Sequence, residues 1–194
     1  MSEKQYFKVL NGYYVKDEEA REHIKGIVKF HAIKASSSCY VIEFPNGKNM
    51  IIDTGLSTQW TNIKNAIDSL GITKFDYAVL SHFHTDHIGN VQNLINTYDF
   101  TGCKWYVQLR PDYVHYSSYI LDPESDYKAQ ITLLENNGFT PIVPINNNYI
   151  TVDADNDIKI RFLNTDPVIA QSYYDRYTEN GVQGTEFNNF SLIT

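Results

Sequence analysis

Apolar and polar residues alternate along this chain in two different rhythms. In "GIVKFHAI" (26–33) they alternate at every second position, which is typical of a half-buried strand. "FDYAVLS" (75–81) is mostly apolar, as expected of a buried strand. Between 60 and 70, apolar residues recur every three or four positions, which predicts an amphipathic helix. Further strands are expected at 39–44, 49–55, 104–109, 140–145, 149–153 and 158–163, and further helices at 17–24, 91–98 and 123–137.

Turn and capping residues mark the ends of several of these elements. The Asn-Gly pair in "PNGK" (45–48) predicts a hairpin turn between two strands. Ser57 or Thr58 is expected to cap the helix that follows, and Gly71 is expected to end it. Gly138 is expected to end the last helix. Strands and helices that alternate in this way indicate a mixed α/β fold.

Length and charge narrow the classes of protein to consider. The chain of 194 residues is long enough for one domain with a substantial core. Its net charge of −7 argues against a general polyanion-binding surface, so nucleic acid is not expected as a partner. No apolar stretch approaches the roughly 20 residues that a membrane span needs. The first residues, "MSEKQYFKVLNGYY", lack the apolar region of a signal peptide.

The stretch "AVLSHFHTDHIGN" (78–90) holds three of the six histidines, directly behind an apolar run. A strand end on a rigid base is a common place for functional side chains. Imidazole and carboxylate groups suit zinc and related divalent ions. His82 and His84 are two positions apart and can project in the same direction, whereas Asp86 and His87 follow after a turn. The spacing predicts two adjacent metal positions, the first with His82 and His84, the second with Asp86 and His87.

One family pattern matches these residues. "SHFHTDHIGN" resembles the His-x-His-x-Asp-His signature of the metallo-β-lactamase superfamily, and "NMIIDTG" resembles the strand that precedes that signature. The order of elements is most similar to the branch that contains phosphorylcholine esterases and the hydrolase domains of DNA-uptake competence proteins. In that branch an N-x-x-S-L strand stands where other members have a further metal-binding histidine. "NNFSLI" (188–193) is similar, which makes Asn188 and Asn189 candidate site residues.

The resemblance implies an αββα sandwich over residues 26–194, preceded by an N-terminal extension or linker at 1–25. It implies two divalent metal ions, usually zinc, with manganese or iron as alternatives. A metal-bound hydroxide would attack a phosphorus or carbonyl centre. Asp86 would bind metal and orient this hydroxide as a catalytic residue. Asp53 would hold a metal-binding side chain by a hydrogen bond.

The sequence departs from the family pattern after the N-x-x-S-L strand. The pattern continues with a Gly-Asp pair, whose carboxylate bridges the metals, and with a closing histidine, and neither follows in these 194 residues. His115 and Asp166 occupy no matching positions, and they are interpreted as a surface residue and a turn residue. We therefore expect a sandwich that is incomplete at its C-terminal side, with an open sheet edge through which the chain could self-associate.

Three functions are compatible with these residues. The first is a metal-dependent phosphodiesterase that acts on small or polymer-linked phosphodiesters, including those of cell surfaces. The second is a lactonase or other ester hydrolase. The third is a non-catalytic metal-binding module or a phage or surface structural module, which the missing closing part of the family pattern favours. "NGYYVKDEEAREHI" (11–24) resembles segments that precede catalytic domains in phage tail proteins, which would indicate an enzyme that acts on cell-surface polymers. A cytoplasmic and a virion-associated location both remain open.

Overall fold

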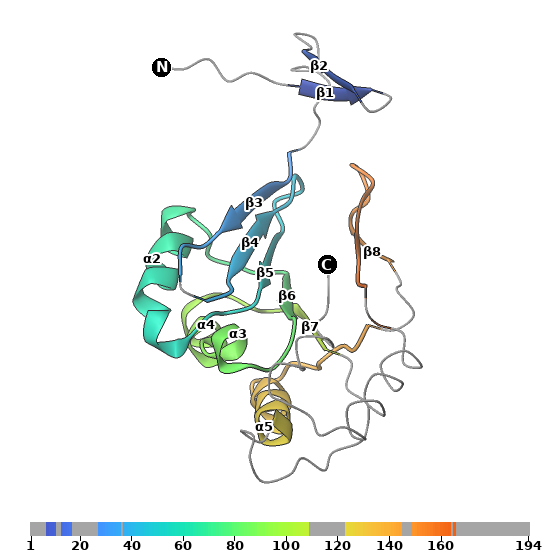
Figure 1. Cartoon of the computed structure of the whole chain (residues 1–194). Helices are drawn as coiled ribbons and strands as arrows, with labels where there is room; N and C mark the ends of the chain where they lie inside the picture. Colours follow the sequence, from blue (N-terminus) through green and yellow to red (C-terminus); the bar gives the residue numbers. More distant parts are fainter. Residues whose placement is uncertain are drawn as a thin grey trace, which may run out of the picture.

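A five-stranded mixed sheet forms the centre of the computed structural model (Figure 1). The structure describes residues 7–10, 13–16, 27–35, 37–108, 123–144, 149–163 and 165. The strands lie in the order β3-β4-β5-β6-β7. β3, β4 and β5 pair antiparallel, whereas β5, β6 and β7 pair parallel. Their bounds are Lys29–Ala32 (β3), Tyr40–Glu43 (β4), Asn49–Ile52 (β5), Tyr77–Leu80 (β6) and Lys104–Val107 (β7).

The predicted turn between β4 and β5 is confirmed. Gly47 has a φ of 80°, a conformation that glycine adopts without the steric cost of a Cβ atom. The Lys48 N–H donates to the Asn46 side-chain oxygen at 3.1 Å. The Phe44 N–H closes the hairpin by donating to the Lys48 carbonyl at 2.9 Å. The Asn-Gly pair thus fixes the register of the two strands.

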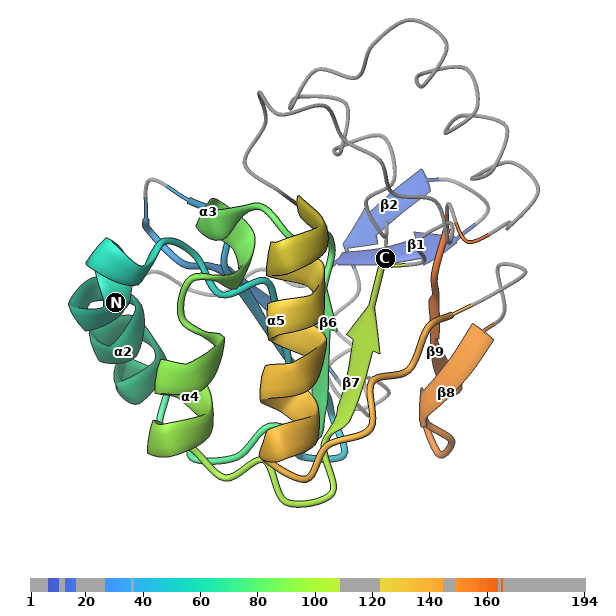
Figure 2. The same cartoon turned by 90° about the horizontal axis from the view of Figure 1, so that it is seen from below.

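Helices cover one face of the sheet, because parallel strands need long crossover connections (Figures 1 and 2). The helices are α2 (Trp60–Ser69), which follows the short 3₁₀ turn η1 (Ser57–Gln59), α3 (Thr85–Ile88), α4 (Val91–Thr97) and α5 (Pro123–Asn136). The core between helices and sheet includes Ile63, Ile67, Val91, Leu94 and Leu134 from the helices and Val41, Ile51, Ala78, Leu80, Trp105 and Val107 from the strands.

A β-hairpin packs on the other face of the sheet. It consists of β8 (Tyr149–Asp153) and β9 (Ile158–Arg161), which pair antiparallel. Alternation along β6 explains the two layers, since Ala78 points to the helices and Val79 to the hairpin. The second core contains Phe44, Met50, Tyr77, Val79, Tyr106, Val152 and Phe162. The described residues therefore form three layers, helices, sheet and hairpin, which confirms the predicted mixed α/β fold class.

Two local predictions are wrong. No side-chain cap hydrogen bond starts α2, and neither Ser57 nor Thr58 caps it, because the chain enters through η1. The preceding Leu56 is held instead by the Ser37 hydroxyl, which accepts its N–H at 3.0 Å. In place of the strand expected at 140–145, the described residues 140–144 form only an isolated bridge between Ile142 and Tyr106, since the prolines at 141 and 144 have no N–H to extend a ladder.

An additional antiparallel pair, β1 (Phe7–Leu10) and β2 (Tyr13–Lys16), lies within the predicted N-terminal extension. The helix expected at 17–24 lies outside the described residues. His115, Asp166, Asn188 and Asn189 lie outside them too. Within the described part of the chain, no helix is both long and apolar enough to cross a membrane.

Candidate metal centre

The candidate site lies at the C-terminal ends of the parallel strands, where functional groups gather in open α/β sheets. Asp53 directly follows β5, and Ser81 and His82 directly follow β6. All three residues are buried, with Asp53 and His82 each only 3% exposed. His84 then precedes α3, whose first turn carries Asp86. The sheet thus brings the "IDTG" and "SHFHTDH" segments side by side.

Asp53 is the centre of a buried hydrogen-bond network. Its Oδ1 accepts the Ser81 N–H at 2.8 Å, and its Oδ2 accepts the Ser81 hydroxyl at 2.7 Å. The same Oδ2 lies 2.7 Å from Nδ1 of His87. Asp53 has a φ of 56°, in the left-handed region, and its N–H donates to the Val79 carbonyl at 2.8 Å. The backbone therefore aims this carboxylate at the first and last residues of the "SHFHTDH" segment, Ser81 and His87.

A second set of contacts fastens the loop after Asp53 to α3. The Thr54 N–H donates to the His87 carbonyl at 2.6 Å. The fully buried Asn90 side chain donates to the carbonyls of Thr54, at 2.8 Å, and Leu56, at 2.7 Å. A Cβ atom on Gly89 would lie 2.5 Å from the Ser57 nitrogen, so only glycine fits there. These contacts between the "IDTG" and "HIGN" segments were not predicted from the sequence, although both segments contain polar residues that could form them.

The four predicted metal-binding side chains form two pairs of donor atoms. Nε2 of His82 lies 3.0 Å from Nδ1 of His84. Nε2 of His87 lies 3.6 Å from Oδ2 of the half-exposed Asp86. The pairs adjoin, since the rings of His82 and His87 are 3.8 Å apart between centroids. The structure therefore brings all four residues close together.

The first donor pair fits one divalent ion. Zinc binds imidazole nitrogens at about 2.0–2.1 Å, so two such nitrogens on a tetrahedral ion lie roughly 3.3 Å apart. The observed 3.0 Å between His82 and His84 is close to this value. Within the described residues, no group of three or more His, Cys, Asp or Glu side chains is arranged so that it could hold a metal ion. The described chain thus supplies donor pairs, and a full coordination shell needs additional ligands.

Burial and nearby charges shift the pKa values of His82 and His87 in opposite directions. Burial, together with the neighbouring His87 and His84, lowers the pKa of His82 to about 3. At neutral pH its imidazole is therefore uncharged, which is the form that binds metals. Burial also lowers the pKa of His87, but the hydrogen bond and charge of Asp53, with the charge of Asp86, outweigh burial and raise it above its ordinary value.

The two cysteines do not offer an alternative nucleophile. Both Cys39 and Cys103 are free thiols. Burial, with a smaller contribution from the Asp53 charge, raises the pKa of Cys39 to about 12. Burial raises the pKa of Cys103 as well. Because the thiolate is the reactive form, neither cysteine is activated at neutral pH.

Comparison with known proteins connects this geometry to a family. A family model described as the metallo-beta-lactamase superfamily matches residues 33–157, more than half of the chain. Endoribonuclease ysh1 of Schizosaccharomyces pombe is 27% identical, over 53% of this chain and 15% of its own length.

Two solved structures match part of this chain. A diphosphatase from the PhnP family is 16% identical, with a TM-score of 0.40, over 64% of this chain and 41% of its own. An archaeal metallo-beta-lactamase superfamily protein from Sulfolobus tokodaii is 22% identical, with a TM-score of 0.38, over 72% of this chain and 56% of its own. The chain thus spans less than two thirds of each of these proteins.

Proposed function

Because the chain belongs to the metallo-beta-lactamase superfamily, we propose that it is a metal-dependent hydrolase, with His82, His84, Asp86 and His87 as ligands of two divalent ions. Zinc is the first choice of metal, because imidazole and carboxylate donors suit it, with manganese or iron as alternatives. The observation that supports this proposal best is the arrangement of these side chains in two adjoining donor pairs, at 3.0 and 3.6 Å. Asn188 and Asn189 remain predicted additional site residues.

Each site residue has a separate task in this proposal. His82 and His84 hold one ion, and Asp86 and His87 hold the other. Divalent ions, when bound, supply Lewis acidity and lower the pKa of a coordinated water to about 7. Asp53 accepts the Nδ1 hydrogen of His87 and so leaves its Nε2 lone pair for binding. The Asp86 carboxylate, which is half-exposed, would also accept a hydrogen bond from a water molecule at the site and orient it.

For the substrate we propose a phosphodiester, either small or attached to a cell-surface polymer. The order of hairpin, "IDTG" loop, helix and histidine segment favours the branch with phosphorylcholine esterases and competence-protein hydrolase domains. The relative from Schizosaccharomyces pombe is by name an endoribonuclease, so that protein cleaves a phosphodiester. The net charge of −7 makes a long polyanion a poor substrate for this chain.

Hydrolysis of bis(p-nitrophenyl) phosphate, with zinc or manganese added, tests the proposal. We expect metal-dependent turnover that His84→Ala abolishes. His31→Ala is the matched control, because His31 lies on β3, pairs with Glu43 at 2.8 Å and is not part of the proposed site. Turnover of a lactone or a carboxylic ester alone would indicate an ester hydrolase instead. A protein with neither turnover nor bound metal would favour the non-catalytic module.

The remaining expectations stay predictions. They are the extension at 1–25, the incomplete sandwich, the association with a phage or cell surface, and self-association through an open sheet edge. β3 is one edge of the central sheet, and its Phe30 is 61% exposed. Sedimentation of the purified chain would test the self-association.

A further inference from the structure

The Ser81 hydroxyl lies between the two functional groups that the proposed function treats separately. Its oxygen is 2.7 Å from Oδ2 of Asp53 and 3.1 Å from Nδ1 of His82. Ser81 is itself buried, with 8% of its surface exposed. The proposed function gives the Ser81 side chain no role.

The position of each hydrogen follows from the donors and acceptors that meet there. An ionised carboxylate can only accept, so the single hydroxyl hydrogen of Ser81 must point to Asp53. The Ser81 oxygen then has only lone pairs to offer to His82. The Nδ1 atom of His82 must therefore carry the hydrogen and donate it. If the Ser81 hydrogen pointed to His82 instead, the Ser81 oxygen and Oδ2 of Asp53 would be two hydrogen-bond acceptors 2.7 Å apart. Such a pair costs free energy in a buried site.

This assignment decides which nitrogen of His82 can bind a metal. A neutral imidazole carries one hydrogen, so Nδ1–H leaves the lone pair on Nε2. Nε2 is the atom that faces His84, at 3.0 Å. His87 is fixed in the same way but without an intermediary, since its Nδ1 lies 2.7 Å from Asp53. One carboxylate thus orients two histidines, the first through Ser81 and the second directly.

We propose that Ser81 is a positioning residue. It connects the Asp53 carboxylate to His82 by two hydrogen bonds and so holds His82 in the Nδ1–H tautomer. The part of this inference that concerns metal affinity rests on the proposed function, whereas the tautomer does not.

A purely structural role for Ser81 is the competing explanation, because its backbone also binds Asp53. The Ser81 N–H donates to Oδ1 at 2.8 Å, and Ser81→Ala would keep this bond. The substitution therefore removes only the contacts of the hydroxyl, those with Asp53 and His82 and a longer one, at 3.4 Å, with Nδ1 of His87. Ser81→Thr is the conservative variant, since it keeps a hydroxyl on the same carbon.

Long-range ¹H–¹⁵N spectra of the full metal-free chain at pH 7.5 measure the tautomer directly. We expect His82 to carry its hydrogen on Nδ1 in the wild type and in Ser81→Thr, and to shift toward Nε2–H in Ser81→Ala. Zinc titration of the same three proteins should show affinity about 10–100-fold lower for Ser81→Ala only. Circular dichroism would verify that each variant is folded.

The outcomes separate this inference from the proposed function. A wild-type His82 in the Nε2–H form, or an unchanged Nδ1–H form in a folded Ser81→Ala, would overturn the role of Ser81 and leave the hydrolase proposal standing. Wild-type protein that binds no zinc, although its His82 tautomer depends on Ser81, would support the relay and count against the proposed metal site.

Discussion

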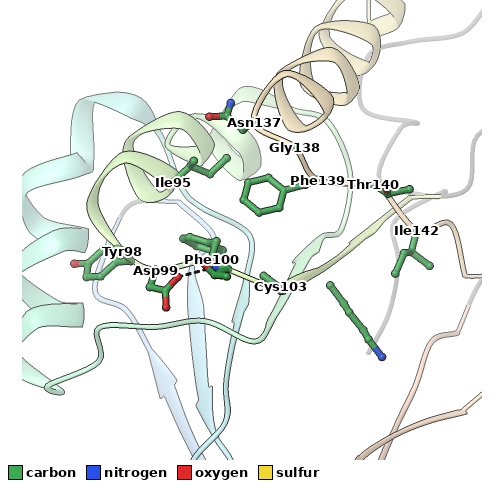
Figure 3. A pocket seen from close by; sticks show the side chains of 13 residues that line it. Ile95, Tyr98, Asp99, Phe100, Cys103, Asn137, Gly138, Phe139, Thr140 and Ile142 are labelled. Atoms are coloured by element: carbon green, nitrogen blue, oxygen red, sulfur yellow. Dashed lines mark hydrogen bonds between the residues drawn. The ribbon is translucent and has the colours of Figure 1, made fainter.

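The two ends of the parallel strands present opposite chemistry. At the C-terminal end, the residues that follow β5, β6 and β7 are buried and polar, namely Asp53, Ser81, His82 and Gln108. At the other end, a hollow of about 620 Å³ opens beside the start of β7. Figure 3 shows Ile95, Phe100 and Phe139 around this hollow. The rings of Phe100, Trp105 and Phe139 pack on one another there, with centroids 5.1 to 6.5 Å apart.

The hollow and the predicted site residues therefore lie at opposite ends of the parallel strands. None of the predicted metal-binding residues lines the hollow, and its charged groups, Asp99 and Lys104, are exposed. The C-terminal end has instead a buried carboxylate and convergent imidazole nitrogens. Burying such groups costs free energy unless they are paired, so their presence is the stronger indication of function.

Removal of a metal donor should give the largest effect. His82→Ala deletes one of the two nitrogens that converge at 3.0 Å, so we expect zinc affinity to fall by more than about 100-fold. Isothermal titration calorimetry on the folded variant would measure this. A loss equal to that of the His31→Ala control would contradict the assignment of the site to this end.

A smaller loss is expected from Asp53→Asn, because this residue contacts His87 and Ser81 and is not one of the proposed metal ligands. The amide can no longer accept at both oxygens from Ser81 and His87. Zinc affinity should fall about 10–100-fold, and turnover with it. Full affinity in this variant would mean that the histidines hold their orientation without the buried carboxylate.

The stability of the metal-free protein should depend on pH through His82. Its pKa is about 3 in the folded chain, against an ordinary value of about 6.5, so the unfolded chain binds an additional proton between these values. The free energy of unfolding should therefore fall as the pH drops from 6.5, by up to about 1.4 kcal/mol per pH unit. Urea unfolding of the wild type and of His82→Gln at pH 7, 6 and 5 would measure it. Parallel curves for the two proteins would refute the expectation.

The smallest effect is expected at the opposite end of the strands. Lys104→Ala changes an exposed residue that lines the hollow, and we expect zinc affinity and turnover to stay within about twofold of the wild type. The variant is matched to His82→Ala as a single truncation at the other end of the same sheet. A large loss of turnover here would give the hollow a part in function.

Local patterns predicted most of the described elements and the proximity of His82 and His84. The Asn46-Gly47 turn and the apolar spacing of α4 depend on neighbours in sequence, and both appear as expected. The same is true of His82 and His84, whose separation by two positions is enough to predict that they converge.

Contacts between distant positions could not be predicted in this way. Asp53 meets Ser81 across 28 positions, and Asn90 meets Thr54 across 36, so neither partner is visible in a local pattern. The predicted cap at Ser57 or Thr58 failed for a related reason, because contacts from Ser37 and Asn90 hold the chain at Leu56 before the helix starts.

The fastening of Asn90 and Gly89 to the 53–57 loop also has a consequence for folding. Asp53 cannot reach Ser81 and His87 until β5 and β6 have paired, since that pairing brings the two loops together. Contacts between such distant positions close a long loop and form slowly compared with a helix or a hairpin. The part of the zinc affinity that depends on Asp53 should therefore develop only after β5 and β6 have paired, and stopped-flow zinc binding during refolding would time that step.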